Sequence, residues 1–181
     1  MPCRFSLLAV ALLALTGAVQ GVNFPWELIQ LNDSHIVNFS AVAFADTGPQ
    51  EPLYGGPECR AFPGSTDWPT GMEWRRLNET MDGALLKPVP VGTACYPGPS
   101  YDVRRCQYLV RVAGSTRFYL DDPLTSLTQW TQGNTCLVAL NAQGNCTQGG
   151  FPVYVVNATN VKQIQAAVNF ARNKNLRLIV K

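Results

Sequence analysis

The feature that most constrains the fold is an alternation of extended and helical patterns near the end of the chain. Residues 151–156 form an apolar, β-branched run, and residues 157–160 interrupt it with side chains that favour helix N-termini. A helix is predicted from there to about Lys174, and residues 176–180 form a second apolar run. The apolar face expected for this helix consists of Val161, Ile164, Val168 and Ala171. A strand, a helix and a strand in this order favour two parallel strands joined by a right-handed crossover.

The composition predicts that few long helices accompany this segment. Charged residues make up 14% of the 181 residues, below the roughly 25% typical of soluble domains. The chain also contains 15 glycines and 13 prolines, which favour turns and loops. A formal net charge of +2 excludes a strongly charged disordered tail and gives no support for nucleic-acid binding.

The beginning of the chain predicts export. Arg4 precedes an apolar run over residues 5–15, and small residues follow at positions 16–18. This is the layout of a secretory signal peptide over residues 1–21, with cleavage after Ala18 or Gly21. The apolar run is too short to cross a bilayer core about 30 Å thick, so a membrane anchor is disfavoured.

Glycosylation sequons agree with a secreted protein. Sequons without proline at the middle position occur at Asn32, Asn38, Asn78, Asn145 and Asn157. Asn157 lies in a predicted strand, which disfavours its modification. We therefore expect a secreted glycoprotein.

The cysteines predict disulfides and leave one thiol over. Removal of the leader takes Cys3, and the cysteines that remain are Cys59, Cys95, Cys106, Cys136 and Cys146. In an oxidising compartment these would mostly pair, and their odd number leaves one free or bonded to another chain. A structural metal is disfavoured, because no Cys-x-x-Cys pair occurs and His35 is the only histidine.

A second helix is predicted before the acidic turn. Val103, Cys106, Val110 and Ala113 recur at helical spacing, with Ser100 as an N-cap and Gly114 as a stop. Cys106 would face inward beside this apolar stripe.

Acidic residues and tryptophans have two interpretations each. Asp121 and Asp122 precede a proline, so a solvated turn is favoured over a catalytic carboxylate pair.

Trp68 and Trp74 lie among turn residues and are interpreted as buried apolar plugs, with a carbohydrate-binding platform as the alternative. His35 is interpreted as a surface residue, and no nucleophile-elbow motif accompanies it.

Charge is distributed unevenly along the chain. No acidic residue follows Asp122, whereas that stretch contains Lys162, Arg172, Lys174, Arg177 and Lys181. One interpretation is a solvated face of the helix. The other is that the end of the second strand, at Lys181, approaches an anionic group such as a pyrophosphate.

These motifs together resemble a known enzyme family. The run Tyr154-Val155-Val156-Asn157-Ala158-Thr159-Asn160-Val161, the helix that follows it and Asn175-Leu176-Arg177-Leu178 resemble the start of the FAD-binding domain of FAD-linked oxidases. Upstream, the resemblance extends through Cys59-Arg60, Asp67-Trp68-Pro69, Trp74, Leu77-Asn78, Cys95-Tyr96, Tyr101, Cys106, Asp122-Pro123, Ser126, Trp130 and Cys136. The chain is similar to fungal secreted oxygen-dependent FAD-linked oxidoreductases of the berberine-bridge-enzyme type, in the vanillyl-alcohol-oxidase superfamily.

The resemblance implies an α+β fold and a flavin enzyme. Residues 22–122 would be a loop-rich, disulfide-stapled N-terminal region, and residues 123–181 would begin a FAD-binding domain that is incomplete. The family implies FAD as cofactor, oxygen as electron acceptor and an alcohol, sugar or secondary-metabolite intermediate as substrate. Its glycine- and histidine-containing flavin loop has no counterpart before Lys181, which would lie nearest the pyrophosphate.

Two hypotheses follow for function. In the first, the chain is the N-terminal portion of an FAD-dependent oxidoreductase, inactive by itself, and a missing C-terminal portion or partner chain would complete it. No catalytic residue is assigned within the chain, and Lys181 is its sole cofactor-binding candidate. In the second, it is a secreted disulfide-stapled module that binds carbohydrate or protein without redox activity. Neither hypothesis involves nucleic acid or a membrane.

Overall fold

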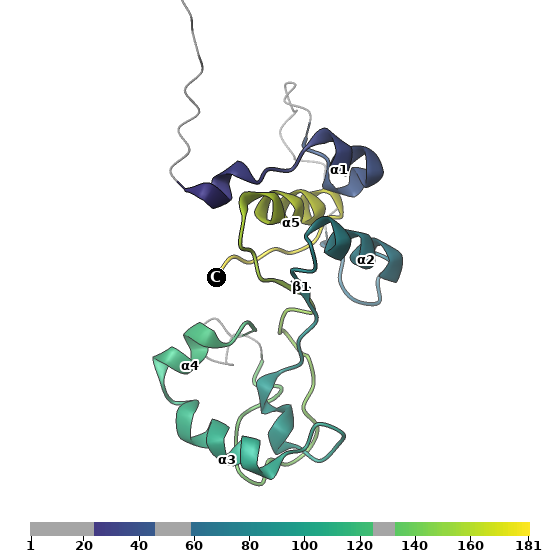
Figure 1. Ribbon diagram of the computed structural model, residues 1–181. Helices are drawn as coiled ribbons and strands as arrows, with labels where there is room; N and C mark the ends of the chain where they lie inside the picture. The colour runs from purple at the N-terminus through teal and green to yellow at the C-terminus, as the bar shows by residue number, and fades with distance from the viewer. Residues whose placement is uncertain (1–23, 46–58, 125–132) are drawn as a thin grey trace, which may run out of the picture.

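The computed structural model describes residues 24–45, 59–124 and 133–181 as a helix-rich chain with two groups of packed elements (Figure 1). Helices α1, α2 and α5 form one group, and α3 and α4 belong to the other. The elements are, in order, η1 (Pro25–Leu28), α1 (Asp33–Asn38), η2 (Ser40–Val42), α2 (Gly71–Thr80), β1 (Leu85–Leu86), η3 (Val91–Cys95), α3 (Val103–Val112), α4 (Thr116–Asp121), β2 (Val155–Val156) and α5 (Val161–Asn173).

Helix α5 confirms the predicted helix and its end. Asn160 caps it by accepting a hydrogen bond from the Gln163 amide at 3.1 Å. Asn175 follows the helix with a φ of 53°, in the left-handed region where a helix terminates. The polar residue just before the helix and the asparagine just after it thus define both ends, as the sequence predicts.

The buried face of α5 differs from the predicted one. Ile164 and Val168 are 48% and 43% exposed, whereas Ala166 and Phe170 are buried. Two polar side chains are buried on the same side: the Gln163 amide donates to the Met81 carbonyl at 2.9 Å, and the Asn169 amide to the Val42 carbonyl at 3.0 Å. Burying a polar side chain costs little free energy when the side chain is hydrogen-bonded. The polar residues of α5 therefore did not indicate which face of the helix is exposed.

The first core surrounds this helix. Phe170 packs near Phe39, with ring centroids 5.9 Å apart, and near Trp74, at 5.1 Å. The buried members of this core are Leu31, Phe39, Val42, Trp74, Leu77, Met81, Ala166 and Phe170. α5 therefore holds together α1, η2 and α2, elements that precede it by many residues.

The predicted parallel pairing of the two apolar runs is wrong. β2 pairs antiparallel with β1, with Leu85 opposite Val156, and Leu176 makes only an isolated parallel bridge to Ala61. Each run takes its hydrogen-bond partner from an upstream segment, which the local pattern of the run does not reveal. The α+β class holds in a coarse form, as a helical chain with one two-stranded sheet.

Two disulfides organise the second core. Cys95 is bonded to Cys106, Cys136 is bonded to Cys146, and Cys59 is an exposed free thiol. The buried members of this core are Cys95, Tyr96, Cys106, Leu124, Cys136 and Phe151. The prediction of paired cysteines with one left over is thus confirmed.

Helix α3 begins later than predicted, and its inward face is confirmed at Cys106 but is wrong at Val103 and Val110. Asp102, not Ser100, caps it by accepting from the Arg105 amide at 2.9 Å. Cys106 and Leu109 are its buried residues, while Val103 and Val110 are exposed. The disulfide fixes the inward face at Cys106, and Leu109 follows one turn later on that face.

The two cores do not correspond to the two regions predicted from the sequence, residues 22–122 and 123–181. Both cores contain residues from before and after Asp122. The domain boundaries stay a prediction, and the expected signal peptide and Trp130 lie outside the described residues.

Trp74 is the buried plug predicted from the sequence. It is 8% exposed and stacks on the Tyr154 ring at 3.9 Å, and Trp68 lies against it at 5.5 Å. A carbohydrate platform needs an exposed ring face, so the burial of Trp74 argues against that alternative.

Replacing Trp74 with Ala should lower the free energy of unfolding by about 3–5 kcal/mol, because a large cavity would open beside Phe170. Met72 is on the same helix and 62% exposed, so Met72→Ala is the matched control and should change stability little. Urea unfolding followed by tryptophan fluorescence and circular dichroism measures both. Equal stability of the two variants would contradict the assigned core.

Candidate functional site

Lys181, the predicted cofactor-binding residue, contacts the end of helix α4. Its ammonium donates to the Tyr119 carbonyl oxygen at 2.6 Å and also to the Asp122 carbonyl oxygen. The last carbonyls of a helix lack intrahelical partners and carry partial negative charge, so a lysine there is favourable. The side chain thus has a structural role in this conformation, and a role toward a cofactor stays a prediction.

Three other basic residues of the C-terminal stretch are also engaged with the protein itself. Lys162 is 8% exposed, and its ammonium lies 2.6 Å from an Asp82 carboxylate oxygen. Lys174 pairs with Glu73, and the Arg172 guanidinium donates to the Ala43 carbonyl at 2.7 Å. The interpretation of a solvated basic face is therefore wrong for Lys162, whereas Lys174 is half-buried and Arg172 is exposed.

Glu73 connects this charge pattern to the start of helix α2. Its carboxylate accepts from the Thr70 amide at 2.8 Å, and the Thr70 hydroxyl accepts from the Glu73 amide at 3.3 Å. This is a capping box, which satisfies two backbone donors of the helix. The hydrogen bond from Lys174, followed by that from the Thr70 backbone, holds the pKa of Glu73 below its ordinary value.

Glycines that approach other atoms closely do not form a phosphate cradle. A Cβ on Gly92 would lie 2.4 Å from the Cys136 carbonyl oxygen, and one on Gly149 would lie 2.2 Å from the Thr135 hydroxyl oxygen. Protein atoms therefore fill the space that a phosphate would need. Gly149 and Gly150 lie in a turn, as predicted. Gly92, Gly149 and the engaged side chains of Lys162, Arg172 and Lys174 therefore do not fit the pyrophosphate of a flavin.

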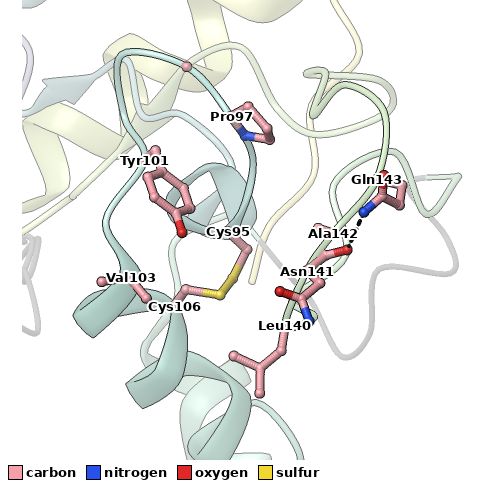
Figure 2. Close-up of a pocket in the computed structure, with 10 residues that line it drawn as sticks. Cys95, Pro97, Tyr101, Val103, Cys106, Leu140, Asn141, Ala142 and Gln143 are labelled. Carbon is pink, nitrogen blue, oxygen red and sulfur yellow. Dashed lines mark hydrogen bonds between the residues drawn. A yellow bond between two sulfur atoms is a disulfide. The ribbon is translucent and has the colours of Figure 1, made fainter.

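A pocket of about 470 Å³ lies in the second core, between the η3–α3 segment and residues 140–143 (Figure 2). Tyr101 and Leu140 line it together with the Cys95–Cys106 disulfide, and Gln143 donates to the Asn141 carbonyl at 3.0 Å. Among its described lining residues there is no carboxylate, imidazole, ammonium or guanidinium group. The pocket therefore offers stacking and amide hydrogen bonds but no strong acid or base. Sequence reasoning missed it, because residues 95–106 and 140–143 come together only through the fold.

The remaining titratable candidates have local structural roles. His35 is part of the N-terminal cap of α1, where its Nδ1 accepts from the Asn32 amide at 3.4 Å. Asp121 pairs with Arg117 at 2.8 Å on an exposed helix face, and Asp122 follows as the C-cap.

In residues 24–45, 59–124 and 133–181, no three His, Cys, Asp or Glu side chains are grouped as a metal site. No helix in these ranges is long and apolar enough to cross a membrane.

The Glu73–Lys174 pair should make stability depend on acid pH. The unfolded carboxyl titrates near pH 4.3, and the folded pKa is lower, so the stabilisation is complete above about pH 4.3. It should be lost as the pH falls from there through the lowered folded pKa. We expect Lys174→Met to flatten this loss without abolishing it, because the Thr70 bonds remain. Urea unfolding between about pH 3 and 7 measures the effect.

Arg177→Met is the control for that measurement. Arg177 is exposed, and its replacement by Met removes one positive charge, as Lys174→Met does. Its profile should keep the wild-type slope below pH 4.3, apart from a small uniform offset. If the free energy of unfolding fell with pH below about 4.3 as steeply in Lys174→Met as in Arg177→Met, the stabilising role of the Glu73–Lys174 pair would be contradicted.

The chain is similar to fungal flavoproteins over much of its length. It is 32% identical over 149 residues to "VAO-type flavoprotein oxidase VAO615" of Thermothelomyces thermophilus, covering 81% of this chain and 26% of that protein. It is 34% identical over 128 residues to "FAD-linked oxidoreductase malF" of Malbranchea aurantiaca, covering 68% and 22%. No protein-family model matches it.

Solved structures show the same similarity. The crystal structure of the VAO-type flavoprotein MtVAO615 from Myceliophthora thermophila C1 superposes with a TM-score of 0.62 at 35% identity, over 68% of this chain and 23% of that one. MtVAO713 from the same fungus gives 0.62 at 31% identity, over 68% and 22%. The chain thus spans about a quarter of the length of the relatives it matches.

Proposed function

The chain is homologous to fungal VAO-type FAD-linked oxidoreductases and matches about a quarter of the length of each relative compared. We therefore propose that it forms the N-terminal portion of such an enzyme. The observation that carries the proposal is the match to MtVAO615, in which fold and sequence agree over 68% of this chain. At 35% identity, that agreement supports common descent as well as a common fold.

In the whole protein, FAD would supply redox chemistry that side chains cannot supply. The substrate would be an alcohol, a sugar or a secondary-metabolite intermediate, and oxygen would accept the electrons. The close glycines and the engaged basic residues do not fit the flavin, so the residues that hold it would belong to other parts of the protein. Within this proposal the chain acts as a scaffold: α5 fixes the two extended segments beside it, and Lys181 packs the second of them against α4.

We also propose that the protein is exported. The leader pattern of residues 1–21, the sequons and the two disulfides support this. Disulfides persist in oxidising compartments, and both here lie in the second core, with Cys95, Cys106 and Cys136 buried and Cys146 partly buried. Cys95 and Cys106 also line the pocket, so oxidising conditions would preserve its walls.

The alternative, a secreted module that binds carbohydrate or protein without redox activity, has less support. Trp74, one of the two tryptophans proposed for sugar stacking, is buried under Tyr154 and Phe170. Trp68 packs on Trp74 and is only half-exposed. A glycan array would favour the module if binding were specific and lost in Trp68→Ala.

Sequencing of the native transcript through the codon for Lys181 and beyond tests the proposed function. We expect an in-frame continuation that encodes a loop containing glycine and histidine, because such a loop would supply the amide donors that the described residues lack. Proteomic detection of peptides from that continuation is the matching test on the protein. A stop codon directly after Lys181 would contradict the proposal.

A further inference from the structure

The folded chain separates its glycosylation sequons by the surroundings of their asparagines. An N-linked glycan is bulky and is attached to the side-chain amide nitrogen, so a folded chain accommodates it only where that side chain projects into solvent. All five sequon asparagines lie within the described residues, so their burial and hydrogen bonds can be compared directly.

Three of them project from the surface. Asn38 is the last residue of α1, Asn145 lies in the loop closed by the Cys136–Cys146 disulfide, and Asn157 directly follows β2. All three are exposed, and within the described residues none of their side chains has a hydrogen-bond partner. The neighbouring residue Phe39 is buried and fixes the backbone beside Asn38.

Asn157 is more accessible than its sequence context predicts. β2 ends at Val156, and the Asn157 backbone amide donates to the Ala84 carbonyl at 2.9 Å. The sheet therefore holds the backbone of Asn157 while its side chain stays outside. The predicted strand disfavoured modification of Asn157, whereas β2 ends at Val156 and the Asn157 side chain is exposed.

Asn78 has the opposite surroundings. It is half-buried on α2, and its side-chain oxygen accepts from the Leu85 amide at 3.0 Å. Its backbone carbonyl also accepts from the Gly83 amide at 2.9 Å. The Asn78 side-chain oxygen therefore closes the turn between α2 and β1, which fixes the half-buried amide and leaves less room for a glycan than at the three exposed asparagines.

We propose that N-linked glycans occupy Asn38, Asn145 and Asn157, and that Asn78 carries none. The inference rests on the proposed export of the chain. The occupied sites lie on three separate parts of the structure: the end of α1, the disulfide loop of the second core and the connection from β2 to α5 (Figure 1).

Asn32 provides a clean background for the test. It is exposed, and its side-chain oxygen caps α1 by accepting from the His35 amide at 3.3 Å and from the Ser34 hydroxyl at 2.7 Å. Aspartate is an equally good N-cap, so Asn32→Asp removes the sequon and keeps the helix cap. All variants are therefore made in the Asn32→Asp chain.

The test is expression of the full chain in a secreting eukaryotic host, once with its own leader and once with a proven leader in place of residues 1–21. Protein from cells and medium is treated with peptide N-glycosidase in heavy-oxygen water, which converts each occupied asparagine to labelled aspartate. Mass spectrometry should find the label in most copies at positions 38, 145 and 157 and in few at 78. Most copies labelled at 78, or few at any of the other three, would overturn the assignment.

Single variants give a second readout that does not depend on peptide recovery. Asn38→Gln, Asn145→Gln and Asn157→Gln should each remove one step of glycosidase-sensitive mobility on a gel, and Asn78→Gln should remove none. A lost step in Asn78→Gln would contradict the proposal. Glycosylation and secretion with the proven leader but not with the native one would contradict export alone, while the pattern of sites would still be decided.

Discussion

The contact of Phe170 with Trp74 and Phe39 is the interaction on which the first core depends. It joins α5 to α2 and to the segment after α1, which are far apart in the sequence. Burial of these aromatic rings is the main favourable term, since each removes a large apolar area from water. Hydrogen bonds then fix the position of α5 along the segment after α2, because the Gln163 side-chain amide donates to the Met81 carbonyl.

The second core relies on covalent links as much as on apolar burial. Its buried residues include three of the four disulfide-bonded cysteines, and the bond between Cys95 and Cys106 attaches η3 to α3. Loops cross-linked in this way lose entropy mainly in the unfolded state, which compensates for a small core. The pocket beside this disulfide exists because the same bond holds its walls in place.

Local patterns predicted elements well and their partners poorly. The end of α5 just before Asn175, the burial of Trp74 and the pairing of all but one of the described cysteines were readable from the sequence, because each depends on nearby residues or on residue type. The pairing of β2 with β1 was not readable, since strand partners are chosen by packing over long distances. The inward position of Cys106 on α3 was predicted correctly, whereas the buried side of α5 was missed because Lys162, Gln163 and Asn169 are polar residues whose partners lie on distant segments.

The candidate site followed the same rule. The resemblance carried by residues 154–178 led to the right enzyme family, but the role expected of Lys181 depends on what surrounds its ammonium group. Here that group meets the carbonyls at the end of α4.

The central claim is that this chain is a part of a flavoenzyme that does not hold the flavin by itself. Equilibrium dialysis of the purified 181-residue chain against FAD, with both disulfides verified by mass spectrometry, tests it most directly. The account predicts weak or undetectable binding, because protein atoms lie against Gly92 and Gly149, and Lys162, Arg172 and Lys174 contact other parts of the chain itself. One tightly bound FAD per chain would contradict it.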